Sequence, residues 1–113
     1  MIYQKRNKFN AKRSTYNGRN YHSKKEASYA MELDWRIKAG EVKEWIPQYK
    51  LPLYVNGILI ANYFIDFKII MHDDSVELHE VKGFETDLWR MKWRITKAVL
   101  DEIEPGAKLV LVK

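Results

Sequence analysis

Two short segments hold the residues that could perform chemistry: Phe-Ile-Asp-Phe-Lys at 64–68 and Glu-Leu-His-Glu-Val-Lys-Gly at 77–83. Apolar and β-branched residues dominate both segments, and the residues between them have turn composition, so a β-hairpin is predicted. Because side chains alternate across a strand, Glu80 and Lys82 share one face. If Asp66 points the same way from the neighbouring strand, two carboxylates and an ammonium group converge.

This combination of charges suits a divalent cation. Two adjacent carboxylates repel each other and raise one pKa unless a cation lies between them. Hard oxygen ligands of this kind favour Mg²⁺ or Mn²⁺. Such an ion can polarise a phosphoryl oxygen and lower the pKa of a bound water, which Lys82 could orient or help to deprotonate. The alternative is a solvated, charge-paired strand face.

Composition limits the class of protein. A chain of 113 residues fits one domain, and 46% hydrophobic with 31% charged residues is typical of a soluble protein. No apolar run approaches the roughly 18 residues of a membrane span, and the N-terminus lacks the apolar segment of a signal peptide. We therefore expect no membrane partner and a cytoplasmic location. With no cysteine, any metal should be carboxylate-bound.

Positive charge gathers at the N-terminus, where residues 1–25 hold eight basic residues and no acid. Because the whole chain carries +5, the other 88 residues carry a net −3. Aromatic residues are interleaved with these cations, which suits a phosphate backbone, although a basic tail can also merely aid solubility. We expect an N-terminal arm with a small hairpin at 1–22, a main domain at 23–113, and DNA contacts from Lys5, Arg6, Lys8, Lys12, Arg13, Arg19 and Lys24.

The first helix is predicted by its ends. An Asn-Gly pair indicates a tight hairpin within 15–21, and the residues from Ser23 to Glu26 fit a capping box. The helix should continue to Lys38 and stop at Gly40. Helical periodicity puts Glu26 at the head of an apolar stripe, so its carboxylate should point at the sheet. The alternative for Glu26 is a capping role alone. The remainder of the stripe is Ala30, Leu33 and Ile37.

Three strands should follow, at 46–55, 58–70 and 76–82, with a last strand at 108–112 buried on both sides. Pro47 and Pro52 cannot donate ladder bonds, so the first strand should lie at an edge or be interrupted. Gln48 occupies a polar position of that strand. The odd positions of the second strand should form an unbroken apolar face opposite Asp66; they are Leu59, Ala61, Tyr63, Ile65, Phe67 and Ile69.

A second helix is predicted from a Thr86 cap to about Ile103. Lys92 lies within or beside its core-facing stripe, near the end of the strand that carries Glu80. A basic stripe runs between two tryptophans, which suits a nucleic-acid surface, although tryptophans also pack against a neighbour or a second subunit. The expected buried stripe is Leu88, Met91 or Lys92, Ile95, Val99 and Ile103, and the basic stripe is Arg90, Arg94 and Lys97, flanked by Trp89 and Trp93.

The order helix, three antiparallel strands, helix, strand resembles the αβββαβ core of the PD-(D/E)xK nuclease superfamily. The segments at 16–27, 47–48, 63–67 and 80–83 are similar, in this joint order, to small phage-encoded endonucleases of that superfamily, and the likeness spans roughly residues 5–112. The resemblance implies an α/β (α+β) fold with a restriction-endonuclease-like core, in which helices flank a mixed sheet.

The resemblance also assigns roles. Glu26 would be the helix-borne acid, Asp66 the metal-bridging aspartate, and Glu80 with Lys82 the Glu-x-Lys pair. One Mg²⁺ or Mn²⁺ would be held by Asp66, Glu80 and the Val81 carbonyl, with Glu26 acting through water or on a second ion. Two accessory residues are implied as well, Gln48 and Lys92.

The implied activity is metal-dependent hydrolysis of DNA phosphodiesters with weak sequence preference. Branched or duplex phage DNA is the expected substrate, cut by a Holliday-junction-resolvase-like enzyme or by a general nuclease. A homodimer would supply two active sites. The alternatives are a non-catalytic DNA-binding protein that retains the nuclease fold and a pure protein-interaction domain.

Overall fold

The computed structural model describes residues 14–113, which form an α+β fold. The elements are β1 (Ser14–Tyr16), β2 (Arg19–Tyr21), α1 (Lys24–Lys38), β3 (Val42–Val55), β4 (Ile58–Met71), β5 (Val76–Val81), α2 (Asp87–Ile103) and β6 (Lys108–Val112). The predicted order of helix, three strands, helix and strand is confirmed. No helix in this part of the chain is long and apolar enough to cross a membrane.

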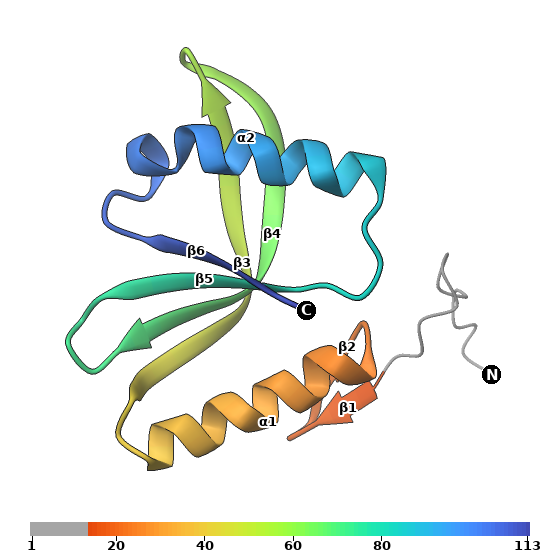
Figure 1. Ribbon diagram of the computed structural model, residues 1–113, viewed down its shortest axis with the longest axis vertical. Helices are drawn as coiled ribbons and strands as arrows, with labels where there is room; N and C mark the ends of the chain where they lie inside the picture. The colour runs from red at the N-terminus through yellow and green to blue at the C-terminus, as the bar shows by residue number, and fades with distance from the viewer. Residues whose placement is uncertain (1–13) are drawn as a thin grey trace.

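The main sheet is mixed and has the strand order β3-β4-β5-β6. Strands β3 to β5 pair antiparallel, whereas α2 carries the chain back so that β6 pairs parallel to β5. A separate two-stranded sheet, β1-β2, lies beside α1 (Figure 1). Strand β3 is an edge strand, as its two prolines predicted.

The two helices lie on opposite sides of β5 (Figure 1), and each covers its own hydrophobic cluster. Val81 packs in the cluster under α1, while Leu78 packs in the cluster under α2. His79 hydrogen-bonds to Tyr29 of α1, and Glu80 hydrogen-bonds to Trp89 of α2. Successive residues of β5 therefore face opposite helices, as strand alternation requires.

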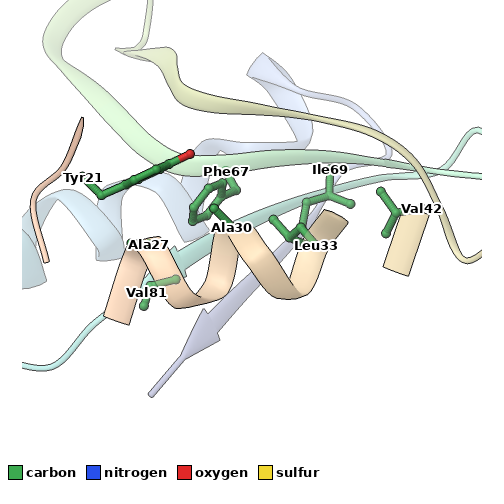
Figure 2. Close-up of a cluster of buried hydrophobic side chains, with 8 residues drawn as sticks. All are labelled: Tyr21, Ala27, Ala30, Leu33, Val42, Phe67, Ile69 and Val81. Atoms are coloured by element: carbon green, nitrogen blue, oxygen red, sulfur yellow. The ribbon is translucent and has the colours of Figure 1, made fainter. Parts of the chain in front are cut away.

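The cluster under α1 ties the small hairpin to the main domain (Figure 2). Tyr21 of β2 is buried in it, and the small side chain of Ala30 leaves room for Phe67 of β4 to approach the helix. The Tyr16 hydroxyl donates to Asp34 of α1 at 2.5 Å. The hairpin therefore shares the core of the main domain.

The predicted helix caps and turns are present. The Ser23 hydroxyl accepts from the Glu26 amide at 3.1 Å, and the Thr86 hydroxyl accepts from the Trp89 amide at 3.0 Å. Gly40 follows the end of α1 with φ +84°, a conformation that glycine adopts without steric cost.

Strand β3 begins four residues earlier than predicted, at Val42, which is fully buried and pairs with Met71. Strand β6 lies at the other sheet edge, so its apolar residues are only partly buried instead of buried on both sides. Both differences reflect the packing of neighbouring elements, which the local pattern does not encode.

The expected unbroken apolar face of β4 is wrong. Leu59 is 47% exposed, and the remaining odd positions divide between the two clusters: Ile65 packs under α2, whereas Phe67 packs under α1. The change occurs at Asp66, opposite Gln48 of β3, whose φ is +51°. Asp66 therefore marks the place along β4 where the buried side chains change from packing under α2 to packing under α1.

The C-terminal part of the predicted stripe of α2 is confirmed, because Ile95, Val99 and Ile103 pack in the cluster under this helix, but its first turns differ from the prediction. Leu88 and Met91, expected inside, are 59% and 53% exposed, while Trp89 is 7% exposed. The indole of Trp89 stacks on Trp93 with 5.3 Å between ring centroids, so these two rings pack against each other beside the exposed stripe of Arg90, Arg94 and Lys97. The buried residues of α2 are Trp89, Thr96, Val99 and Leu100.

Candidate active site

Asp66 and Glu80 lie where β4 and β5 separate. The ladder between these strands runs from Ile70 and Val76 to Phe67 and His79 and stops there. Beyond it, the Asp66 carboxylate accepts from the Val81 amide at 2.8 Å, and the Glu80 carboxylate accepts from the Asp66 amide at 3.2 Å. The two carboxylates thus satisfy backbone donors that a continued ladder would otherwise pair.

Glu80 is 3% exposed and has further partners on the α2 side. Its Oε2 accepts from the Trp89 indole Nε1 at 2.8 Å and from the Tyr63 hydroxyl. The same indole lies 2.7 Å from the Tyr63 hydroxyl oxygen. Sequence reasoning missed both partners, and the signal available was that a buried Tyr or Trp needs a polar partner.

Glu26 extends from α1 toward the same place, as predicted. It is 7% exposed, and burial together with the Glu80 carboxylate raises its pKa to about 7. The ammonium of Lys82 and a hydrogen bond to the His22 backbone oppose this rise. Glu26 therefore lies within electrostatic reach of both members of the Glu-x-Lys pair.

Asp66 is 8% exposed, and its pKa is raised far above the usual range. Burial is the main cause, followed by the Glu80 carboxylate and then by Glu26, while the Val81 amide acts in the opposite direction. Three buried carboxylates share one region, and strong mutual perturbation of this kind is typical of functional sites.

Lys82 is half-buried, with its Nζ 5.2 Å from the centroid of the Trp89 ring. Its backbone amide donates to Val112 at the end of β6, at 2.9 Å. The Lys25 ammonium donates to the Lys82 carbonyl at 3.2 Å, a contact that sequence reasoning missed. Helix α1 and strand β6 thus both fix the end of the Glu-x-Lys segment.

Of the two accessory residues, one reaches the carboxylates. The Gln48 amide Nε2 lies 3.4 Å from Asp66 Oδ1. Lys92 is half-buried about one turn beyond Trp89, and no ion pair joins it to an acid among residues 14–113. The structure therefore brings Gln48, but not Lys92, into contact with the site.

Within the described chain, no three acidic or histidine side chains form a ready-made metal-ligand group. The donor chemistry nevertheless fits a hard divalent cation, because three carboxylates share a region with one ammonium group. Burial and then the neighbouring carboxylates raise the pKa values of Glu26 and Asp66, so placing negative charge on these groups costs free energy. A cation bound between these carboxylates would offset the free-energy cost of their negative charge.

His79, the neighbour of Glu80, faces away from this site. Its ring nitrogens lie 2.6 Å from the Tyr29 hydroxyl and 2.8 Å from a Glu77 oxygen, on the α1 side of β5. Burial lowers the pKa of His79. His79, Tyr29 and Glu77 therefore form a separate polar cluster, and His79 makes no contact with the three carboxylates of the candidate site.

The basic residues predicted to contact DNA fall into three groups. Lys5, Arg6, Lys8, Lys12 and Arg13 lie outside the described residues. Arg19, Lys24, Arg94 and Lys97 are exposed. Arg90 is exposed too, but it pairs with Asp87 at 3.1 Å and with Glu85 at 3.5 Å.

An open cavity of about 820 Å³ lies at the segment that follows Lys82 in the sequence. Its lining residues are Gly83, Phe84, Glu85, Thr86, Asp87, Leu88 and Arg90.

Comparison with known proteins places the chain in a family without assigning an activity. No curated protein and no solved structure matches it significantly. Residues 6–107 match the family described as "Protein of unknown function (DUF1064)", which accounts for most of the 113 residues. The chain belongs to the DUF1064 family.

Proposed function

We propose that this chain is a metal-dependent DNA endonuclease built on a restriction-endonuclease-like αβββαβ core of the PD-(D/E)xK superfamily. One observation carries the proposal: buried carboxylates from α1, β4 and β5 gather beside a lysine. They are Glu26, Asp66 and Glu80, and the lysine is Lys82. Burying three acids in one place costs free energy that a bound cation would offset, and perturbed acids of this kind cluster at functional sites.

Asp66, Glu80 and the Val81 carbonyl would hold Mg²⁺ or Mn²⁺, with Glu26 acting directly or through water. When bound, such an ion supplies a Lewis acid for the phosphoryl oxygen and a bound water of lowered pKa. Gln48 supports the Asp66 carboxylate through its amide. Lys82 would orient the attacking water and offset the negative charge that develops on the phosphate.

DNA is the proposed partner. The exposed cations Arg19, Lys24, Arg94 and Lys97, together with the N-terminal basic residues, would bind flanking phosphates. Contacts of this kind carry no base information, so weak sequence preference and strong salt dependence are expected. Branched or duplex phage DNA in the cytoplasm of a bacterial host is the proposed target, cut in the manner of a junction resolvase or of a general nuclease.

A homodimer would place two such sites on one branched or duplex substrate. The tip of the β3–β4 hairpin supports this arrangement because it belongs to a run without charge, residues 51–64, and exposes large apolar side chains. Tyr54, Ile58, Leu59 and Ile60 are between 44% and 65% exposed.

One observation favours a second candidate, a non-catalytic DNA-binding protein. Both Glu80 oxygens already accept hydrogen bonds from protein donors, and the described residues hold no ready-made metal-ligand group. In that case the carboxylates would hold β4 and β5 together and bind no cation.

The deciding experiment is cleavage of a labelled four-way junction, linear duplex and single strand with Mg²⁺, Mn²⁺ or EDTA. The wild type is compared with Glu80→Ala and Lys82→Ala. Glu44→Ala and Lys50→Ala are matched controls, because they remove the same charges from exposed positions of β3. Metal-dependent cutting lost only in the first pair supports the nuclease. DNA binding without cutting on every substrate supports the second candidate.

A further inference from the structure

Tyr63 and Trp89 form a closed set of hydrogen bonds with Glu80. Both side chains direct a donor at the same carboxylate oxygen, and each lies within hydrogen-bond distance of the other. All three residues are at most 7% exposed. With the Asp66 amide on the second oxygen, Glu80 accepts from three protein donors. Its carboxylate is therefore fixed in one orientation.

Trp89 also touches the second member of the Glu-x-Lys pair. The ammonium of Lys82 lies 5.2 Å from the Trp89 ring centroid, within the range of a cation–π interaction. The Trp89 backbone amide donates to the Thr86 cap at the start of α2, and the Trp89 ring stacks on Trp93. A single indole thus contacts both Glu80 and Lys82 from a rigid position.

Packing alone does not account for these contacts. An apolar pair of similar size would fill the space under α2 without burying two polar donors, and buried donors are costly unless they are matched. In metal sites, the residues that hydrogen-bond to a ligating carboxylate orient it, and their loss typically weakens metal binding about 10- to 100-fold. The geometry around Glu80 has this form.

We propose that Tyr63 and Trp89 are positioning residues of the nuclease site, which hold the Glu80 carboxylate toward the cation and align Lys82 beside it. This inference rests on the proposed function. Neither residue touches the reacting atoms, because both act through Glu80 and Lys82.

The test measures Mn²⁺ binding by isothermal titration calorimetry and stability by urea unfolding. Tyr63→Phe removes one donor, and Trp89→Phe removes the other while keeping an aromatic ring. Tyr49→Phe is the matched control for the first variant, since the Tyr49 hydroxyl donates to Glu104 in an equivalent tyrosine–glutamate contact away from the site. Trp45→Phe is the matched control for the second variant, since the Trp45 indole donates to Asp34 at 2.8 Å in an equivalent tryptophan–carboxylate contact away from the site.

We expect Tyr63→Phe and Trp89→Phe each to weaken Mn²⁺ binding about tenfold or more, while the two controls bind like the wild type. If Trp89→Phe does not fold, the comparison of Tyr63→Phe with Tyr49→Phe decides. Wild-type affinity in folded Tyr63→Phe would overturn the inference and leave the nuclease intact. A wild type that neither binds Mn²⁺ nor cuts DNA would overturn the proposed function and this inference together.

Discussion

Asp66 and Glu80 form reciprocal hydrogen bonds between side chain and backbone at the point where β4 separates from β5. The Asp66 carboxylate accepts from the amide that follows Glu80, and the Glu80 carboxylate accepts from the Asp66 amide. Each side chain therefore completes the backbone hydrogen bonding of the other strand. This exchange joins the sheet and holds two acids close together at the same time, so structure and proposed chemistry depend on the same four oxygen atoms.

Asp66→Asn separates these two roles. The asparagine amide oxygen can still accept from Val81, whereas Asp66→Ala would leave that buried amide unpaired at a cost of about 1–3 kcal/mol. We expect Asp66→Asn to lose Mn²⁺ binding yet unfold at a urea concentration no lower than the wild type. Calorimetry and urea unfolding of both variants check this. Equal stability of Asn and Ala variants would contradict it.

Glu26→Gln should change stability in a pH-dependent way. The pKa of Glu26 rises from 4.5 in the unfolded chain to about 7 in the fold, so the unfolded state loses its proton first. Stability therefore falls as pH rises from about 4.5 to 7, and the loss of unfolding free energy above that window is about 3 kcal/mol. Gln avoids this cost because it carries no charge.

Urea unfolding at pH 8 and pH 4.5 measures this effect. We expect Glu26→Gln to be more stable than the wild type at pH 8 and equal to it at pH 4.5. Glu32→Gln, an exposed position on the same helix, is the matched control and should show no difference. A wild type and Glu26→Gln pair that stays parallel across this window would contradict the assignment of Glu26 to the carboxylate cluster.

The position of Glu26 was predictable from sequence, and the details around Glu80 were not. Helical periodicity requires a residue on the stripe of Ala30 and Leu33 to face the core, whatever its charge. Strand alternation likewise puts Glu80 and Lys82 on one face. That Asp66 pairs with a backbone amide depends on where β4 departs from β5, and this point is set by three-dimensional packing.

Helix α2 shows the same limit. An apolarity pattern predicts Leu88 and Met91 inside, yet the helix buries Trp89 in their place. The Trp89 indole donates a hydrogen bond to the buried Glu80 carboxylate, which a leucine or methionine could not do. A periodicity of apolar residues along a helix cannot predict a hydrogen-bond partner that lies on another strand.

The exposed cations of α2 should differ in their effect on DNA binding. Arg94→Ala combined with Lys97→Ala should lower the slope of log K against log salt by about 2, as expected for two lost phosphate contacts. Arg90→Ala should change the slope less, because Asp87 and Glu85 already pair with it. Fluorescence anisotropy across a salt series measures these slopes. Identical slopes in all variants would exclude α2 from the interface.

The apolar tip of the β3–β4 hairpin should control oligomeric state. If two copies join there, Ile58→Glu would bury a charge in the contact and shift the dimer to monomer. Lys43→Glu, an exposed change at the other end of β3, is the control. Sedimentation velocity at several concentrations distinguishes the species. A monomeric wild type would contradict the dimer, and a dimeric Ile58→Glu would place its interface elsewhere.

Gln48 offers a test of how the hairpin bends at the site. Its φ of +51° costs a residue with a side chain about 1–2 kcal/mol, whereas glycine adopts this conformation freely. Gln48→Ala and Gln48→Gly both remove the amide that faces Asp66, so they differ only in this backbone cost and in chain entropy. We expect the Gly variant to be the more stable of the two by urea unfolding. Equal or reversed stabilities would show that the strand relaxes to an ordinary extended conformation at Gln48, and the change of side at Asp66 would then need another cause.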